Sequence, residues 1–162
     1  MTRSASFGAV VDARTRLLIL GSLPGVRSLA AAQYYAHPGN RFWELIGAVI
    51  DRDLRVLPYA ARLAALAAAG VGLWDTVASA ERAGSLDSAI RAPQANDIAA
   101  VLASLPGLRA VAFNGQTAAR LARAIDFGAA ARIVLPSSSA AHAVTLPVKL
   151  SAWLELRRFL AG

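Results

Sequence analysis

Four short apolar segments alternate with segments of helical periodicity, and this alternation constrains the fold more than any other feature of the sequence. The apolar segments predict β-strands at residues 16–20, 71–77, 108–115 and 131–136. The periodic segments predict helices at residues 39–50, 59–70, 96–107, 116–127 and 149–162. Strands that are separated by helices form a mostly parallel sheet with both faces covered. We therefore expect an α/β protein with three α/β/α layers and a central, mostly parallel four-stranded sheet.

The length and the amino-acid composition limit what the chain can hold. Its 162 residues are enough for a sizeable core, and we expect a single domain over residues 1–162. Cysteine is absent, so disulfides, cysteine-ligated zinc and iron–sulfur clusters are excluded. The two histidines, His37 and His142, are too few for a histidine-rich metal site. We expect a protein that works without a metal or another cofactor.

The net charge of +7 comes almost entirely from arginine, since Lys149 is the only lysine. A basic chain of this size favours a polyanionic partner, with nucleic acid the first candidate. An alanine- and arginine-rich chain with almost no lysine is, however, also typical of a GC-rich genome. No apolar run reaches the ~18 residues of a membrane span, and the N-terminal segment lacks the long apolar stretch of a signal peptide. We expect a cytoplasmic protein, associated with the nucleoid if the cell is bacterial.

Polar and turn-forming residues follow every predicted strand. They are Gly21-Ser22-Leu23-Pro24-Gly25, Asp75-Thr76, Asn114-Gly115 and Pro136-Ser137-Ser138-Ser139. Ligands of open α/β sheets bind beyond the carboxyl ends of the strands, so these segments predict one common site. The ordinary polarity of loops explains the serines and glycines. It does not explain the pairs Tyr34-Tyr35 and Phe42-Trp43, which follow the first segment within a stretch that we expect to be mainly loop.

Several segments resemble the motifs of a known enzyme family. "GSLPG" and "YYAHPGNRFW", within residues 21–43, are similar to the first motif of the uracil-DNA glycosylase superfamily, above all in its mismatch-specific branch. "LPSSSAAHA" at residues 135–143 resembles the second motif, which grips the DNA backbone. "GVGLWDTVASAERAGSLDSAI" at residues 70–90 and "AVAFNGQTA" at residues 110–118 resemble the hypoxanthine-DNA glycosylase branch. The likeness covers most of the chain.

The resemblance implies a uracil-DNA glycosylase-like fold and a role in base excision repair. Such an enzyme flips a deaminated base out of DNA and hydrolyses its N-glycosidic bond, which leaves an abasic site. The segments that resemble the hypoxanthine branch imply that this base is hypoxanthine, from deoxyinosine in double- or single-stranded DNA. We expect a monomer. We also expect no strand cleavage, because the only side-chain amine, that of Lys149, lies outside both motifs.

Three positions depart from the pattern of the superfamily. Leu23 stands where many members have an Asp or Asn that orients or activates water, and Leu135 where several branches have a His that stabilises the leaving base. Ala140 replaces a proline that is usual in the hypoxanthine branch. The resemblance to that branch assigns catalysis instead to the Asn of the His-Pro-x-Asn segment, here Asn40. An asparagine at the start of a helix can also be its N-cap, and this alternative stays open.

The other site residues are predicted from the resemblance and from the chemistry of base flipping. An extruded base needs an aromatic face, for which Tyr35 is the first candidate, followed by Tyr34 or Phe42 unless Phe42 belongs to the core. The carboxylate of Asp75 can accept a hydrogen bond from the N1–H of hypoxanthine, unless Asp75 only ends its strand. Ser22 and Asn114 complete the predicted base-binding residues. The predicted contacts to the DNA backbone are Gly25, Ser28, Ser137, Ser138, Ser139 and His142.

Two other functions fit the same residues. A uracil- or mismatch-specific DNA glycosylase would share the first motif. A non-catalytic nucleic-acid-binding module on the same scaffold would explain why Leu23 and Leu135 occupy two positions that are polar in related enzymes. A nucleotide-binding loop at "GSLPG" is disfavoured, because the chain lacks both the Lys-Ser/Thr of a P-loop and the three-glycine dinucleotide pattern.

Overall fold

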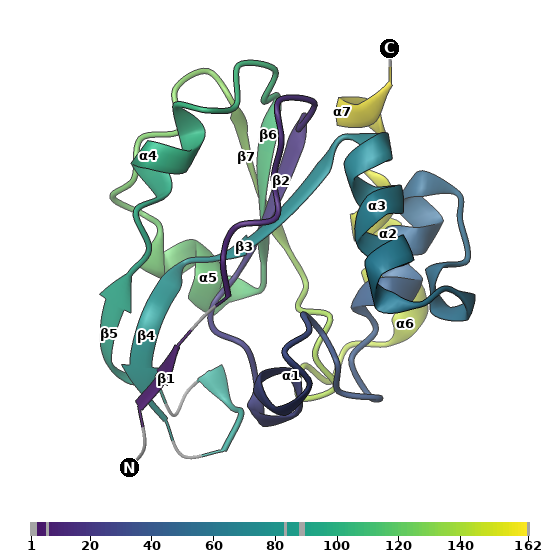
Figure 1. Cartoon of the computed structure of the whole chain (residues 1–162). Helices are drawn as coiled ribbons and strands as arrows, with labels where there is room; N and C mark the ends of the chain where they lie inside the picture. Colours follow the sequence, from purple (N-terminus) through teal and green to yellow (C-terminus); the bar gives the residue numbers. More distant parts are fainter. Residues whose placement is uncertain (1–2, 6, 83, 88–89, 162) are drawn as a thin grey trace.

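The computed structural model describes residues 3–5, 7–82, 84–87 and 90–161. Its centre is a four-stranded sheet of β2 (Leu17–Gly21), β3 (Val71–Asp75), β6 (Ala110–Asn114) and β7 (Ala131–Leu135). All four strands run parallel, in the order β3-β2-β6-β7 (Figure 1). The central sheet thus consists of the four strands that the apolar segments predict.

The central strands are apolar throughout because both faces of the sheet are covered. β2, β3 and β6 are buried along their whole length. Leu17 and Ile19 belong to one hydrophobic cluster, and Leu18 and Leu20 belong to another, as the two-residue period of a strand requires. Burial of each such side chain contributes about 1.5–3 kcal/mol, so the sheet is a firm support for the loops at its ends.

Helices pack on both faces of the sheet and form the two outer layers (Figure 1). One layer holds α2 (Phe42–Ile50), α3 (Tyr59–Ala69) and α6 (Leu146–Leu154), with the short η1 (Leu54–Val56) and α7 (Arg157–Leu160). The other layer holds α4 (Ile98–Leu102) and α5 (Gln116–Leu121). The three-layer α/β/α fold expected from the sequence is confirmed.

A second, smaller sheet was not predicted. It is antiparallel and contains β1 (Arg3–Ala5), β4 (Val77–Glu81) and β5 (Arg91–Ala95), in the order β1-β4-β5. The prediction of one strand over residues 71–77 is wrong at its end, because β3 stops at Asp75 and β4 begins at Val77. The sequences of β4 and β5, "VASAE" and "RAPQA", are small and polar and lack an apolar alternation. Their strand structure depends on pairing between distant parts of the chain, which no local pattern reveals.

Several predicted helices differ from the observed ones in length. The segments predicted at 39–50, 96–107 and 116–127 are helical only over α2, α4 and α5. The ends of α4 and α5 pass into turns with i to i+3 hydrogen bonds, such as Ser104 N to Val101 O at 2.9 Å. The predicted closing helix at 149–162 is divided into α6, which begins at Leu146 with Pro147 in its first turn, and α7.

One helix lies in the stretch that was expected to be loop. α1 (Val26–Ala31) follows the Gly-Pro-Gly segment after β2 and ends at Ala32, which has a left-handed φ of 52°. Its six residues, "VRSLAA", are too few to show a helical period in the sequence.

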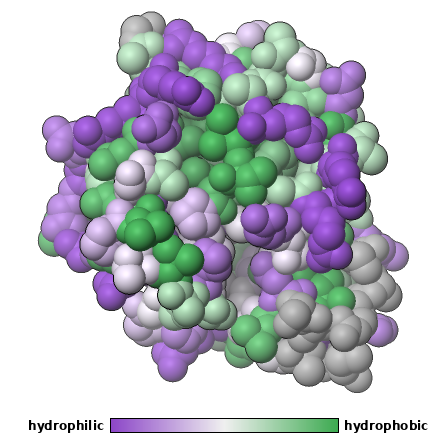
Figure 2. Space-filling model, turned by 180° about the vertical axis from the view of Figure 1, so that it is seen from behind, coloured by the Kyte–Doolittle hydropathy of each residue, from purple (hydrophilic) through white to green (hydrophobic). Residues whose placement is uncertain are grey.

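Large apolar side chains are exposed at a few places. In the described part of the chain they are Val26, Val56, Leu86, Val134 and Val148, which are between 51% and 75% exposed. Seen from behind, a broad hydrophobic area is bordered by hydrophilic residues (Figure 2). No helix within the described residues has both the length and the apolar character to cross a membrane.

Gly47 offers a test of the packing of α2, because alanine normally stabilises a helix interior by about 1 kcal/mol relative to glycine. A Cβ at Gly47 would lie 2.5 Å from the carbonyl oxygen of Arg52, which is a backbone atom and cannot rotate away. We predict that Gly47→Ala lowers the free energy of unfolding, measured in urea, by about 1–3 kcal/mol. Gly8→Ala is the control, since a Cβ there meets no atom within 4 Å. Wild-type stability of Gly47→Ala would contradict this packing.

Candidate active site

The carboxyl ends of the parallel strands meet at one edge of the central sheet. In the strand registers Gly21 is paired with Asp75, and Asn114 is paired with Leu135. Just beyond the strands, Thr76 N donates to Gly21 O at 2.8 Å. The polar segments that follow the strands therefore lie side by side.

Gly21, the last residue of β2, leaves room for two side chains to approach the end of the strand. A Cβ at Gly21 would lie 2.7 Å from Asp75 Oδ1 and 3.1 Å from Tyr35 Oη. A larger residue would displace one or both of them. Asp75 and Tyr35, which the sequence proposes as base-binding residues, are thus brought to the same point.

The carboxyl group of Asp75 is buried and incompletely paired. The residue is 3% exposed, and its Oδ2 has no hydrogen-bond partner among the described residues. Burial raises the pKa of Asp75 to about 8, the negative charge of Asp87 adds to the increase, and the positive charge of Arg82 opposes it. At neutral pH the group is mainly neutral, so it can both donate and accept a hydrogen bond.

Tyr35 stacks on Phe42 beside this carboxyl. The ring centroids are 3.8 Å apart and the planes differ by 14°. Phe42 is fully buried and also makes an edge contact with Trp153, so it supports Tyr35 from inside the core. Tyr35 has a left-handed φ of 54°, which is uncommon for a bulky residue and often marks a functional constraint. Burial, and then the charge of Asp75, raise the pKa of Tyr35, while the nearby side chain of Asn114 opposes the increase.

Asn40 has one polar atom engaged and one free. Its Oδ1 accepts a hydrogen bond from Phe42 N at 3.0 Å, next to the start of α2. This contact resembles the N-cap that was the alternative role, although the cap position itself belongs to Arg41. The amide nitrogen of Asn40 makes no hydrogen bond to any described residue. The hydrogen bond to the oxygen fixes the orientation of the amide group. The unpaired nitrogen is therefore a fixed donor that a ligand can use.

The second loop, residues 136–140, is held by side chains from several elements. Asn114 donates through Nδ2 to Ser138 Oγ and accepts from Ser138 N, both at 2.9 Å. Arg41 N donates to Ser138 O at 2.9 Å. Trp153 Nε1 donates to Pro136 O at 3.0 Å. The polar atoms of Asn114 are therefore used to shape the loop, while its predicted contact with a base stays a prediction.

Lys149 provides a further link to this loop. Its side chain is buried, and Nζ donates to Ser139 O at 2.9 Å. Burial, and then the charge of Arg41, lower the pKa of Lys149. The sequence placed this amine outside both motifs, and the fold brings it against the second loop.

The residues predicted to contact the DNA backbone divide into inner and outer groups. Ser28 and Ser138 are buried, and Ser28 Oγ accepts from Ala36 N at 3.0 Å. Ser137, Ser139 and His142 are partly exposed on the second loop and just after it. Gly25 is also partly exposed, with Ser85 Oγ 3.1 Å from the position of a Cβ. The partly exposed group is the better placed of the two to reach a phosphate.

The predicted site residues include none from the third loop, whose described residues are Gly84 to Asp87; Asp87 had weaker support from the sequence than Asp75. Ser22 Oγ donates to Asp87 Oδ1 at 2.5 Å, so this predicted base-binding hydroxyl is tied to the third loop. Arg82, which precedes it, is buried and donates to the carbonyl oxygens of Leu23 and Pro24. The similarity of residues 70–90 to the hypoxanthine branch also points to this segment.

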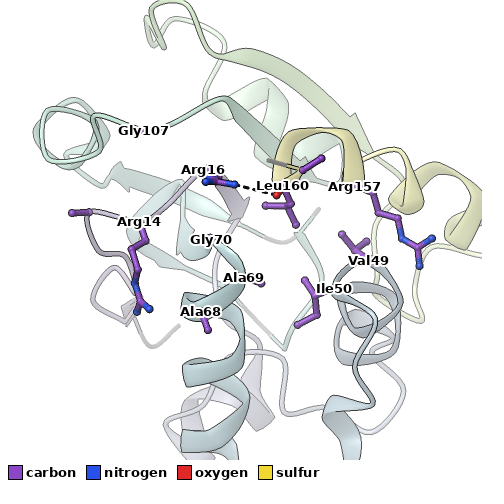
Figure 3. Close-up of a pocket in the computed structure, with 12 residues that line it drawn as sticks. Arg14, Arg16, Val49, Ile50, Ala68, Ala69, Gly70, Gly107, Arg157 and Leu160 are labelled. Atoms are coloured by element: carbon purple, nitrogen blue, oxygen red, sulfur yellow. Dashed lines mark hydrogen bonds between the residues drawn. The ribbon is translucent and has the colours of Figure 1, made fainter.

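A hollow of about 730 Å³ lies at the opposite edge of the sheet, near the amino ends of β2 and β3 (Figure 3). Its lining is apolar at Val49 and Ile50 and basic at Arg16 and Arg157. Arg16 Nη1 donates to Leu160 O at 3.2 Å, and Arg157 Nη2 donates to Ala48 O at 2.7 Å. Both arginines thus have a structural role, because each donates to a backbone carbonyl near the end of a helix. Their position in this hollow therefore does not require a bound ligand.

The site contains carboxyl, hydroxyl and amide groups but no cluster suited to a metal. Within the described ranges, no three His, Cys, Asp or Glu side chains are grouped so that they could hold a metal ion. The groups that converge at the sheet edge suit hydrogen bonding to a flat polar molecule, with Tyr35 as an aromatic contact.

Comparisons with known proteins give consistent results. A family model described as the Uracil DNA glycosylase superfamily matches residues 7–158. A "Hypoxanthine DNA glycosylase" of Methanosarcina barkeri (strain Fusaro / DSM 804) is 37% identical over 156 residues, which cover 94% of this chain and 97% of the relative. A protein of the same name from Methanosarcina acetivorans is 40% identical over 136 residues, which cover 84% of this chain and 86% of the relative.

A solved structure is similar over nearly the whole chain. The solution NMR structure of a candidate uracil DNA glycosylase from Methanosarcina acetivorans matches with a TM-score of 0.86 and 37% sequence identity. The match covers 98% of this chain and 99% of that chain.

The raised pKa of Asp75 predicts how stability depends on pH. An unfolded chain loses this proton near pH 3.8, whereas the folded protein keeps it until about pH 8. Over that window the folded state binds more protons, so stability falls as pH rises. We predict that the free energy of unfolding of wild type, relative to Asp75→Asn, falls by up to about 1.4 kcal/mol per pH unit between pH 4 and 8 and then levels off. Thermal unfolding of both proteins at each pH measures this difference in free energy. A difference that does not vary with pH would refute the prediction.

Proposed function

Because the chain belongs to the Uracil DNA glycosylase superfamily and is a DNA glycosylase, we propose that it releases hypoxanthine from deoxyinosine in DNA and leaves an abasic site. Both Methanosarcina relatives named above carry the name hypoxanthine DNA glycosylase. The observation that carries the proposal is the buried carboxyl of Asp75 at the end of β3, next to Tyr35, with an Oδ2 that has no partner among the described residues.

Recognition of the base rests on Asp75. Hypoxanthine presents an N1–H donor beside the O6 acceptor. A neutral carboxyl accepts from the donor through its carbonyl oxygen and donates to O6 through its hydroxyl, whereas an ionised carboxylate can only accept. The N3–H and O4 of uracil form the same kind of edge, so Asp75 also favours uracil as a second candidate base.

Tyr35 supplies the aromatic face. An extruded base that stacks on an aromatic side chain gains about 1–3 kcal/mol. Tyr35 is partly exposed, while Phe42 is buried behind it, so the direct contact is assigned to Tyr35 and the support to Phe42. The left-handed backbone of Tyr35 is the kind of strain that a site retains when it fixes a side chain.

Asn40 is proposed to position the attacking water or the sugar. Its free amide nitrogen is a donor, and its oxygen is held by Phe42 N. The glycosidic bond breaks with oxocarbenium character, so a weakly activated but well-placed water is sufficient. This role suits a first motif in which Leu23 is buried among apolar side chains and cannot bind water.

Contact with the DNA backbone is proposed for Gly25, Ser137, Ser139 and His142, with the net charge of +7 favouring association with phosphates. The buried Ser28 and Ser138 support the loops that carry these contacts. We further propose that the chain is one domain, acts as a monomer in the cytoplasm at the nucleoid, and cleaves no strand. The amine of Lys149 is engaged with Ser139 O, which supports hydrolysis rather than a lyase reaction.

The direct test is incubation with labelled duplexes that contain one deoxyinosine or one deoxyuridine, followed by alkali. We predict release from the deoxyinosine duplex, with strand breaks that appear only after alkali. A duplex with normal bases is the control. Release from deoxyuridine alone would favour the uracil alternative, and binding without release from either duplex would show a non-catalytic module.

Two variants separate catalysis by Asn40 from its contact with Phe42 N. Asn40→Asp keeps the oxygen acceptor but loses the amide donor, whereas Asn40→Ala loses both and is expected to cost about 1 kcal/mol of stability. We predict that the single-turnover release of hypoxanthine falls at least about 100-fold in both variants. Asn40→Asp should melt close to wild type, and both should still bind the duplex. A folded Asn40→Ala that releases the base at the wild-type rate would exclude the catalytic role.

A further inference from the structure

The first loop, residues 21–25, is joined to the third loop by a buried arginine. The side chain of Arg82 is 1% exposed, and its guanidinium donates to the carbonyl oxygens of Leu23 and Pro24 in the first loop. It also donates to Ser85 O, at 3.4 Å, in the third loop. The guanidinium thus fixes the position of the two loops relative to each other. Because an arginine stays protonated, it also places a permanent positive charge beside them.

Asp87 of the third loop lies between this cation and a predicted base-binding residue. Its Oδ1 accepts a hydrogen bond from Ser22 Oγ at 2.5 Å and is 3.9 Å from Arg82 Nη1. A hydroxyl has one proton, and Ser22 donates it to Asp87, so the Ser22 oxygen can only accept a hydrogen bond from a ligand. Asp87 therefore fixes a hydroxyl directly next to Gly21, against which the carboxyl of Asp75 lies.

The ionisable side chains that interact electrostatically with the carboxyl of Asp75 come from three segments. Tyr34 and Tyr35 precede α2, Arg82 follows β4, and Asp87 lies in the third loop. Burial raises the pKa of both tyrosines, so they stay uncharged at the pH at which Asp75 titrates. Within the part of the chain that the structure describes, Asp87 and Arg82 are therefore the charged groups that act on Asp75.

These two charges affect Asp75 in opposite directions. Burial is the main cause of its raised pKa; the negative charge of Asp87 raises this pKa further, and the positive charge of Arg82 lowers it. We propose that Asp87 and Arg82 are positioning residues of the reaction, which orient Ser22 and set the pH range over which the site can bind its base. This inference rests on the proposed function, in which the protonated carboxyl of Asp75 recognises the base.

The test is single-turnover release of hypoxanthine from a deoxyinosine duplex, measured over a pH range on both sides of 8. Asp87→Asn keeps an oxygen that can accept from Ser22 but removes the negative charge, so Asp75 should lose its proton at a lower pH. We expect the midpoint of the decline in release at high pH to fall by about 0.5 pH unit or more. Arg82→Gln removes the opposing charge, and its midpoint should rise. Titration of the base itself is the same for every variant, so the differences report on the protein.

Two further variants separate the charge of Asp87 from its hydrogen bond. Asp87→Ala removes both, so it should show the same fall in the midpoint and, at the low end of the pH range, release that is at least about 5-fold slower than in Asp87→Asn. Asp53→Asn is the matched control. Asp53 is also a partly exposed carboxylate paired with an arginine, Arg55 at 3.2 Å, but it lies directly before η1 and does not act on Asp75. Its midpoint and its rate should equal those of wild type.

Carbon-13 NMR of the Asp75 carboxyl in the same variants gives a readout that needs no substrate. Its titration midpoint should fall in Asp87→Asn and rise in Arg82→Gln; if Arg82→Gln does not fold, Asp87→Asn decides alone. An unchanged midpoint of titration or of release in Asp87→Asn, or shifts in the same direction in both variants, would overturn the proposal. Failure of the proposed function would look different, because wild type itself would release no hypoxanthine while the titration of Asp75 still differed between the variants.

Discussion

The close approach of the Asp75 carboxyl to the end of β2 is the constraint on which the site depends. Because Gly21 has no Cβ, this carboxyl and the Tyr35 hydroxyl can both lie against the end of β2. The strand residues behind them are buried. An unpaired carboxylate is costly to bury, so the group is held neutral instead. A neutral carboxyl can both donate and accept, as the lactam edge of a deaminated base requires. The proposed recognition of the base by Asp75 therefore depends on strand packing and needs no polar side chain at position 23, which is Leu23.

The second loop, residues 136–140, is held in place by hydrogen bonds from several elements. Ala140 lacks the fixed φ of the proline that is usual at this position in the hypoxanthine branch. Asn114, Trp153 and Lys149 bind the loop from β6 and α6, and Arg41 N binds it from the residue before α2. Arg41 follows Asn40 directly, so the proposed catalytic residue and the proposed phosphate contacts are positioned by one connected set of hydrogen bonds. A substitution at Asn114 would accordingly disturb both.

The sequence predicts the central sheet because β2, β3, β6 and β7 are short apolar runs whose order requires parallel pairing. It does not predict β4 and β5, whose small polar residues become strands only by pairing with each other and with β1. The site divides in the same way. Asp75 and Tyr35 were identifiable because they follow strand ends or motif residues. Other parts of the site depend on contacts between segments that are distant in the sequence. Examples are the hydrogen bond of Asn114 to Ser138 and that of the buried Arg82 to Leu23, and no local sequence pattern predicts either.

The charge state of Asp75 can be measured directly by carbon-13 NMR of aspartate-labelled protein, with Asp75→Asn used to assign the carboxyl resonance. A carboxyl that is buried as described should titrate with a midpoint of about 8, far above the usual 3.8. Addition of the free base hypoxanthine at neutral pH should shift the resonance while the group stays protonated. A midpoint near 4, with no response to the base, would mean that Asp75 is an ionised carboxylate and that a neutral carboxyl does not recognise the flipped base.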